Sequence, residues 1–200
     1  MRKFLPFFLI VIAPAAAWSA APASYEIRNE TFDLGEDGVP VEWKAYPPAN
    51  GQGTKMEAAE GGGITLTDAD PTAGVGLGQW IKVEGGYKYK ASLTADGEGG
   101  LLFAINFVPR IPPKIGQMNQ IKIGELKAWV PAGEAGTLEG VAPAEAVYAW
   151  VWVYSPTKTE TDAKVHVKSV KIEELGAAPA GEVPAAATPS PKKSADPSAN

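Results

Sequence analysis

The chain has 200 residues, of which 45% are hydrophobic and 20% charged, and its formal net charge is −5. This length and composition suit one globular domain with its own core, and the acidic balance argues against nucleic acid or anionic lipid as a partner. The absence of cysteine excludes disulfides, thiolate metal sites and a lipid-modified N-terminal cysteine.

The first residues have the form of a secretory signal. The basic start Met1-Arg2-Lys3 precedes an apolar run, Phe4 to Ala13, that is too short and too interrupted by proline to span a bilayer. Small residues between Ser19 and Ala23 offer a cleavage site. We therefore expect residues 1–23 to be a signal peptide and the mature protein to be secreted or periplasmic, with no membrane contact after cleavage.

From about Tyr25 onward, short β-rich runs alternate with Gly, Pro, Asn and Asp, which is typical of an all-β sandwich. No segment has convincing helical periodicity. We expect residues 24–176 to form one antiparallel β-sandwich with no helix longer than two turns. The expected strands are residues 25–28, 42–45, 54–58, 63–67, 76–83, 87–95, 101–108, 121–130, 136–141, 147–154 and 163–173.

The last expected strand changes its register. Val165 and Val167 fall on odd positions but Val170 and Ile172 on even ones, so an extra residue near Lys168-Ser169 must restore the inward register as a β-bulge. Residues 177–200 then hold five prolines, eight alanines and no aromatic residue. We expect this segment to be a disordered tail that packs on nothing.

The stretch from Ala146 to Tyr154 alternates small and aromatic side chains without a fault. As a β-strand it sends to one face Val147, Ala149, Val151 and Val153. To the other face it sends Tyr148, Trp150, Trp152 and Tyr154. The small face suits a packed core, whereas four rings leave indole N–H groups and hydroxyls to satisfy, so we expect the aromatic face to be a partly exposed platform. The reverse, with the rings in the inter-sheet core and the valine face under a loop, stays open.

Rings at alternate positions of a strand stand roughly 6.6 to 6.8 Å apart, which is on the scale of sugar rings in a chain. Sugar rings have apolar faces that stack on such platforms. If each stacked ring removes about 60 Å² of apolar surface from water, it contributes about 1.5 kcal/mol before ordering costs, so two or three rings imply weak to moderate affinity.

Polar candidates lie near a proline-stiffened, amide-rich loop from Val108 to Gln120. Asn106 faces away from its apolar neighbours on the preceding strand, and the loop adds Gln117 and Asn119. Such groups suit a groove that bonds sugar hydroxyls, but for any single residue an ordinary polar loop is the simpler explanation. Trp80 and Trp129 are further candidates for the platform.

Several short motifs resemble those of a known family. Asn29-Glu30-Thr31-Phe32-Asp33, Gly38-Val39-Pro40 and Trp43 resemble the N-x-x-F-E, G-x-P-x-x-W opening of carbohydrate-binding modules of the family 4, 9 and 22 type. Residues 79–92 and 141–146 are similar to later motifs of the same group, so the resemblance spans roughly Tyr25 to Leu175. It implies a galactose-binding-like β-jelly roll in which Trp43 and Tyr89 belong to the core.

The chain departs from that family where a structural calcium is often held. The family's acidic D-D-V-x-L segment corresponds here to Lys168-Ser169-Val170-Lys171-Ile172, with lysine where a carboxylate is needed. Glu26 and Asp33 remain near the N-terminal ligand positions, but a hard cation wants six to eight oxygens. Calcium is therefore disfavoured, and we expect no cofactor and no metal ligand.

Little in the sequence points to catalysis. His166 lies on the solvent side of its strand, no serine sits in a nucleophile-elbow motif, and no histidine pair or cysteine cluster suits zinc. A carboxylate dyad that forms only in the fold stays open, but we expect no enzyme.

We expect non-catalytic binding of a polysaccharide or oligosaccharide through the aromatic platform. The alternative is a structural or adhesive sandwich that docks a protein partner through the same face. The sequence does not specify the sugar, the choice between internal chains and chain ends, or the oligomeric state.

Overall fold

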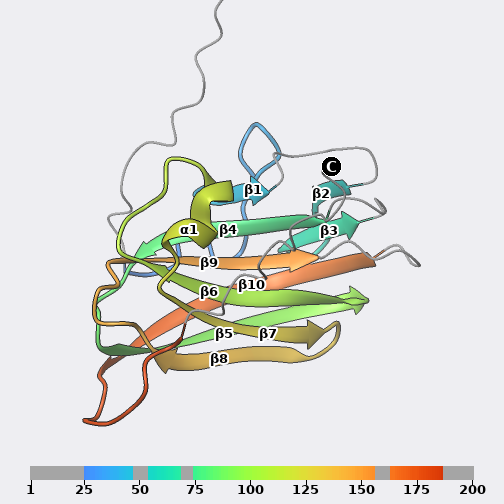
Figure 1. The fold of residues 1–200 in the computed structure, drawn as a ribbon. Coiled ribbons are helices and arrows are strands. Elements are labelled where there is room, and N and C mark those ends of the chain that lie inside the picture. Colours follow the sequence, from blue (N-terminus) through green and yellow to red (C-terminus); the bar gives the residue numbers. More distant parts are fainter. Residues whose placement is uncertain (1–24, 47–53, 69–73, 156–162, 187–200) are drawn as a thin grey trace, which may run out of the picture.

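The protein is an antiparallel β-sandwich, seen in a computed structural model that describes residues 25–46, 54–68, 74–155 and 163–186. The strands are β1 (Lys44–Tyr46), β2 (Thr54–Ala58), β3 (Ile64–Asp68), β4 (Val75–Lys82), β5 (Tyr87–Glu98), β6 (Gly100–Val108), β7 (Gly124–Pro131), β8 (Ala135–Val141), β9 (Tyr148–Ser155) and β10 (Ala163–Ala177). They form two five-stranded sheets, ordered β1-β4-β9-β6-β7 and β2-β3-β10-β5-β8 (Figure 1). The predicted all-β jelly-roll sandwich is confirmed.

In the part of the chain that the structure describes, helical structure is confined to one connection. The 3₁₀ turn η1 (Ile115–Gln117) leads directly into α1 (Met118–Ile121), which precedes β7. The predicted strand over residues 121–130 therefore begins three residues late, at Gly124. Within the described ranges, no helix exceeds two turns, and none is long and apolar enough to cross a membrane.

One predicted strand is wrong. Residues 25–28 form no strand, because a side chain replaces the neighbouring strand as their partner. Arg28 N donates to Gln79 Oε1 over 2.7 Å, and Gln79 Nε2 donates to the Arg28 carbonyl oxygen over 3.0 Å. The buried amide of Gln79 thus fixes the N-terminal segment at one point, where a strand would need a ladder.

The core lies between the two sheets and contains alternate residues of each inner strand. From β9 it takes the small face, with Ala149, Val151 and Val153 all fully buried. Trp43 and Tyr89 are also buried in this core, as the family resemblance implied. The four aromatic side chains of the other face, Tyr148, Trp150, Trp152 and Tyr154, are called the aromatic ladder below. The alternative in which this ladder forms the inter-sheet core is therefore wrong.

The predicted bulge in β10 is confirmed. The pairing of β10 with β5 shifts between Val167 and Ser169. Because of that shift, Val165 and Val167 before it and Val170 after it are fully buried in the core. Ile172 also belongs to the core and is 9% exposed. A strand without the extra residue would turn one of the two pairs toward solvent.

The opening motif has a structural role. Asn29 has a positive φ of 54°, and its side-chain nitrogen donates to the carbonyl oxygens of Asp33 and Val41. Its own carbonyl oxygen accepts a hydrogen bond from Trp43 Nε1 over 3.1 Å, and the rings of Phe32 and Trp43 pack with centroids 4.8 Å apart. The motif therefore closes the loop before β1 over the end of the core.

The segment after β10 packs against the sandwich. Ala185 N donates to the Val141 carbonyl oxygen over 2.9 Å, beside a parallel bridge between Val141 and Pro184. Lys88 forms ion pairs with Glu139 and, over 2.9 Å, with Glu182. Figure 1 shows this red segment turning back toward β8.

The prediction that nothing packs from residue 177 onward is therefore wrong for residues 177–186. Backbone groups, the small Ala185 side chain and the Lys88–Glu182 ion pair hold the segment, and a composition rich in alanine and proline does not reveal these contacts. Residues 187–200, and the predicted signal over 1–23, lie outside the described residues.

A charged cluster joins β5, β10 and the turn between β2 and β3. Asp96 pairs with Lys168 Nζ over 2.6 Å and with His166 Nδ1 over 3.1 Å, while His166 Nε2 lies 2.8 Å from the Gly62 carbonyl oxygen. The hydrogen bond from Lys168 is the main cause that lowers the pKa of Asp96 below its ordinary value of 3.8. The ionised form of Asp96 is therefore the one that the fold favours.

This cluster predicts a pH-dependent loss of stability. A lowered folded-state pKa contributes stability that is complete above the ordinary pKa and is lost as the pH falls through the folded value. Asp96→Asn should therefore be less stable than the wild type at pH 7, and the gap should shrink as the pH falls below 3.8. Urea midpoints measured at neutral and acidic pH check this, and an equal gap at both would contradict it.

The burial of β9 predicts a second contrast. Val151→Ala removes two methyl groups from a fully buried site and should lower the free energy of unfolding by about 2 kcal/mol. Val147→Ala is the matched control, because Val147 is 45% exposed just before the same strand, and it should change stability by under about 0.5 kcal/mol. Denaturant unfolding followed by fluorescence separates the two variants.

Candidate functional site

The candidate site lies on the outer face of the sheet that contains β9. Tyr148, Trp150, Trp152 and Tyr154 point away from the core, toward the same side as alternate residues of the strands on both flanks. On β4 the residues paired with them are, in order, Lys82, Trp80, Gly78 and Gly76. On β6 they are Val108, Asn106, Ala104 and Leu102.

Two glycines of β4 let the rings lie down on the sheet. A Cβ at Gly78 would overlap the indole of Trp150, and one at Gly76 would lie 2.8 Å from Tyr154 Cδ2. Any side chain there would push the ring away. The signal was present in the sequence, since glycine recurs at 74, 76 and 78 in a run that otherwise reads as a strand.

The rings do not form a flat platform. Trp152 and Tyr154 have centroids 5.3 Å apart and planes inclined by 47°, and Trp80 and Trp150 are 5.0 Å apart and inclined by 50°. Each pair has the tilted packing that aromatic quadrupoles favour. The rings therefore form two tilted pairs and not the expected row of evenly spaced stacking faces.

Residues 109–123, called the cover below, lie over part of this aromatic face. The loop brings η1 and α1 over the sheet beside β1 and β4 (Figure 1). Met118 is buried there with Trp150 and Val108 in a second, smaller apolar cluster. Packed around that cluster are Trp80, Ile115, Ile121, Tyr148 and Trp152.

The cover corrects one expectation about the ladder. Trp152 is half-buried, as a partly accessible ring should be, but Trp150 is only 3% exposed. A flexible thioether such as Met118 fills irregular space against an indole, and the apolar side chains of the loop gain more from this packing than from exposure to water. Strand periodicity cannot reveal which loop will close over a ring.

Beside the cover, a hollow of about 170 Å³ remains open to solvent. Its lining residues are Tyr46, Gly76, Leu77, Asn106, Ile115, Gly116, Met118, Asn119, Trp150 and Trp152. Tyr46 belongs here because it pairs with Gly76 across β1 and β4. The hollow therefore combines two indole rings, a tyrosine and two amides.

The hollow brings together half of the residues predicted for the site. Asn106, Asn119, Trp150 and Trp152 line it, whereas Tyr148, Tyr154, Trp80 and Gln117 do not. Tyr148 and Trp80 pack against the covered cluster, and Tyr154 packs against Trp152. Sequence reasoning missed Tyr46, Gly116 and Met118, which reach the hollow only through the pairing of β1 with β4 and the course of the loop.

Asn106 connects the hollow to a buried charge. The amide satisfies its neighbours when its nitrogen donates to Glu125 Oε1 over 3.0 Å and its oxygen accepts from Trp152 Nε1 over 2.9 Å. Glu125 in turn pairs with Lys122 over 2.7 Å and Lys127 over 2.8 Å. This chain of contacts fixes the Trp152 ring, and the amide keeps one further donor and acceptor.

The described lining of the hollow carries no charge. Among the residues that the structure describes, no acidic or basic side chain lines it, and the charge of Glu125 behind Asn106 is balanced by two lysines. Outside the hollow, the indole N–H of Trp80 is buried without an acceptor among the described residues. His166 lies on β10 in the other sheet, and no group of three potential metal ligands occurs in the described part of the chain.

Comparisons with known proteins identify the fold. No protein-family profile and no curated protein matches the sequence. Among solved structures, the enzymatically active domain of tailspike protein 4 from bacteriophage CBA120 aligns over 68% of this chain with a TM-score of 0.53 and 13% identity. This chain spans only 20% of the length of that tailspike chain.

Solved carbohydrate-binding modules are also similar. A CBM4 structure aligns over 69% of this chain and 98% of its own, with 14% identity and a TM-score of 0.49. A family 22 module of Clostridium thermocellum Xyn10B aligns over 79% and 99%, with 14% identity and a TM-score of 0.44. The alignment with the tailspike domain, over 68% of this chain, concerns the fold alone.

The contacts of Asn106 predict its contribution to stability. Asn106→Leu keeps the side-chain size but leaves Trp152 Nε1 and a nearly buried Glu125 oxygen without this partner, which should cost about 1–3 kcal/mol of unfolding free energy. Gln120→Leu is the control at an exposed amide and should cost under about 0.5 kcal/mol. Equal melting temperatures for Asn106→Leu and the wild type would contradict the hydrogen-bond network.

Proposed function

We propose that this protein binds carbohydrate, without chemical conversion, in the hollow formed by β1, β4, β6, β9 and the cover, which consists of residues 109–123. The observation that carries the proposal is the half-buried Trp152 ring, held by Asn106 and flanked by Tyr46 and Asn119. Sugar rings present apolar faces to aromatic rings and hydroxyls to amides. The hollow offers both kinds of contact within one small space.

The proposal rests on this geometry, since the likeness to solved modules concerns the fold. Fold and function are separable, and the site must supply the argument. A binding role without catalysis suits a hollow whose described lining has no acidic or basic side chain, because general acid and base catalysis needs such groups within reach. Export from the cytoplasm is part of the same proposal, supported by the signal-like residues 1–23.

Docking of a protein partner through the aromatic face is the weaker alternative. The cover and the sheet make the accessible part of that face recessed, and Trp150 is almost inaccessible. Stable protein interfaces are broad and bury more than about 1,000 Å² in total. A small hollow with amide walls fits a sugar better.

The test pairs a glycan array with two tryptophan variants. Trp152→Ala removes the stacking surface and should weaken binding to an array-positive glycan by about tenfold or more, corresponding to roughly 1.5 kcal/mol. Trp129→Ala is the matched control: Trp129 lies on β7, is 43% exposed and does not line the hollow, so affinity should stay within about twofold.

Isothermal titration supplies the affinities, and a CD spectrum of each variant checks that it is folded. Trp152→Phe retains an aromatic ring and serves if the alanine variant does not fold. An array on which no glycan binds above background would overturn the proposal. Equal losses of affinity in the Trp152 and Trp129 variants would contradict the placement of the binding site in the hollow.

A further inference from the structure

We propose that the hollow holds a single neutral sugar ring at the end of a chain, so that the protein recognises glycan ends and not internal segments. This inference rests on the proposed function and adds the class of ligand. It follows from the volume, the walls and the charge of the hollow, and from the way in which the cover divides the aromatic ladder.

The size of the hollow limits its occupant. Pockets for drug-sized ligands have volumes of roughly 300–1,000 Å³. The hollow has about 170 Å³, which is below that range and suits one six-membered ring with its hydroxyls. Further rings of the same glycan would therefore lie outside it.

The cover prevents a chain from lying along the ladder. Ile115, Gly116 and Met118 form one wall of the hollow, and behind that wall Trp150 and Tyr148 pack under the same segment. A glycan stacked from Tyr154 to Tyr148 would have to pass through this apolar cluster. An internal segment that stacked along the ladder would need its central rings accessible, and Trp150 is only 3% exposed under this segment.

The opposite wall comes from the other side of β4. Tyr46 stands at the end of β1, paired with Gly76, and it is 43% exposed at the rim. Across from it, Asn119 is an exposed amide on α1. Together with Asn106 in the base, they surround a ring with hydroxyl and amide groups on several sides, as recognition of a terminal residue requires.

The lining also selects against charge. A carboxylate taken from water into this apolar space would lose hydration, and no basic side chain of the described residues lines the hollow to compensate it. The nearest described ion pairs, those of Lys122 and Lys127, are already made with Glu125 behind Asn106. A neutral hexose or pentose is therefore the class of ring that fits.

Titration with a length series tests the inference. The probes are glucose, galactose and xylose, and the β-1,4-linked oligosaccharides of each up to six rings. For the sugar that binds, the disaccharide should reach the affinity of the hexasaccharide within about threefold. Glucuronic and galacturonic acid should bind at least about tenfold more weakly than glucose and galactose.

The outcomes separate this inference from the proposed function. Affinity that rises more than about tenfold between two and six rings would overturn end recognition while leaving carbohydrate binding in place. Binding of a uronic acid at the level of its neutral counterpart would also overturn it. If no probe binds and the glycan array is empty, both proposals fail together.

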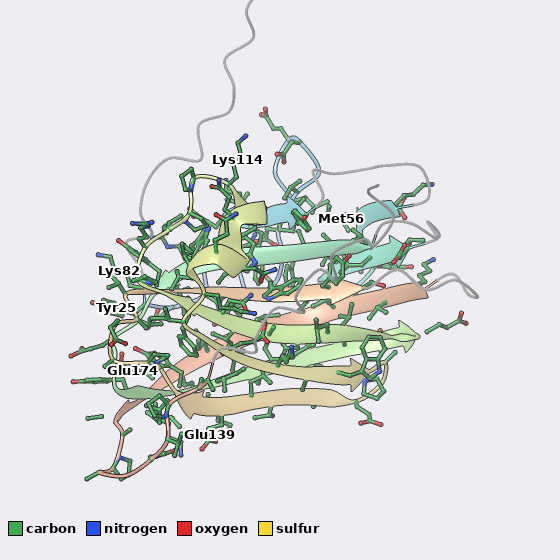
Figure 2. All side chains as sticks on the ribbon, in the orientation of Figure 1. Tyr25, Met56, Lys82, Lys114, Glu139 and Glu174 are labelled. Carbon is green, nitrogen blue, oxygen red and sulfur yellow. The ribbon has the colours of Figure 1, made fainter. Side chains whose placement is uncertain are left out.

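A variant in the cover tests the location. Gly116 lines the hollow and has nothing within 4 Å of the place where a Cβ would stand, and its φ is outside the left-handed region, so a large side chain fits there without strain. Gly116→Trp should abolish binding of the monosaccharide. Lys114→Trp adds the same side chain at an exposed position that does not line the hollow, at the edge of the molecule in Figure 2, and should bind like the wild type.

Both variants should keep the wild-type CD spectrum and melting temperature within a few degrees, because both sites are exposed. A folded Gly116→Trp protein with unchanged affinity would overturn the assignment of the terminal ring to this hollow. If that variant does not fold, Asn119→Ala on the rim replaces it, with a loss of affinity of about threefold or more expected from one lost hydrogen bond.

Discussion

The strict alternation of β9 is the constraint on which the rest of the structure depends. One face of the strand is small enough to be buried between two sheets, so the four aromatic side chains must point the other way. A sheet face with so many rings cannot stay fully exposed at low free energy, because each ring carries a large apolar surface. Three features accommodate these rings. The glycines of β4 leave space for them, the amide of Asn106 bonds the indole N–H of Trp152, and the loop of residues 109–123 covers Trp150.

Features that depend on local period could be predicted from the sequence. The small face of β9 in the core, most strand positions and the bulge at Lys168-Ser169 follow from alternation that any pairing partner would preserve. The half-buried position of Trp152 is of the same kind. The core positions of Trp43 and Tyr89 followed from motif resemblance, and the hydrogen bonds of Asn29 supply the physical reason for the first of them.

Features that depend on long-range pairing could not be predicted in the same way. Tyr46 reaches the hollow only because β1 pairs with β4, a register that no local pattern specifies. The burial of Trp150 depends on Met118, which lies in a loop without period, and residues 25–28 bond to the side chain of Gln79 instead of to a strand. In each case the deciding partner is distant in sequence and contacts through a side chain or a loop.

The return of the chain after β10 has a consequence for how the molecules behave in solution. β8 is an outer strand of its sheet, and an outer strand presents unpaired amides and carbonyls on which another chain can add. At the Val141 end of β8, the carbonyl oxygen of Val141 already accepts a hydrogen bond from Ala185 N. Pro184, which lies beside Val141, has no backbone N–H to donate to another chain. Lys88 and its two glutamate partners place charge along the same margin. The segment after β10 thus covers the Val141 end of this outer strand, where another chain could otherwise add.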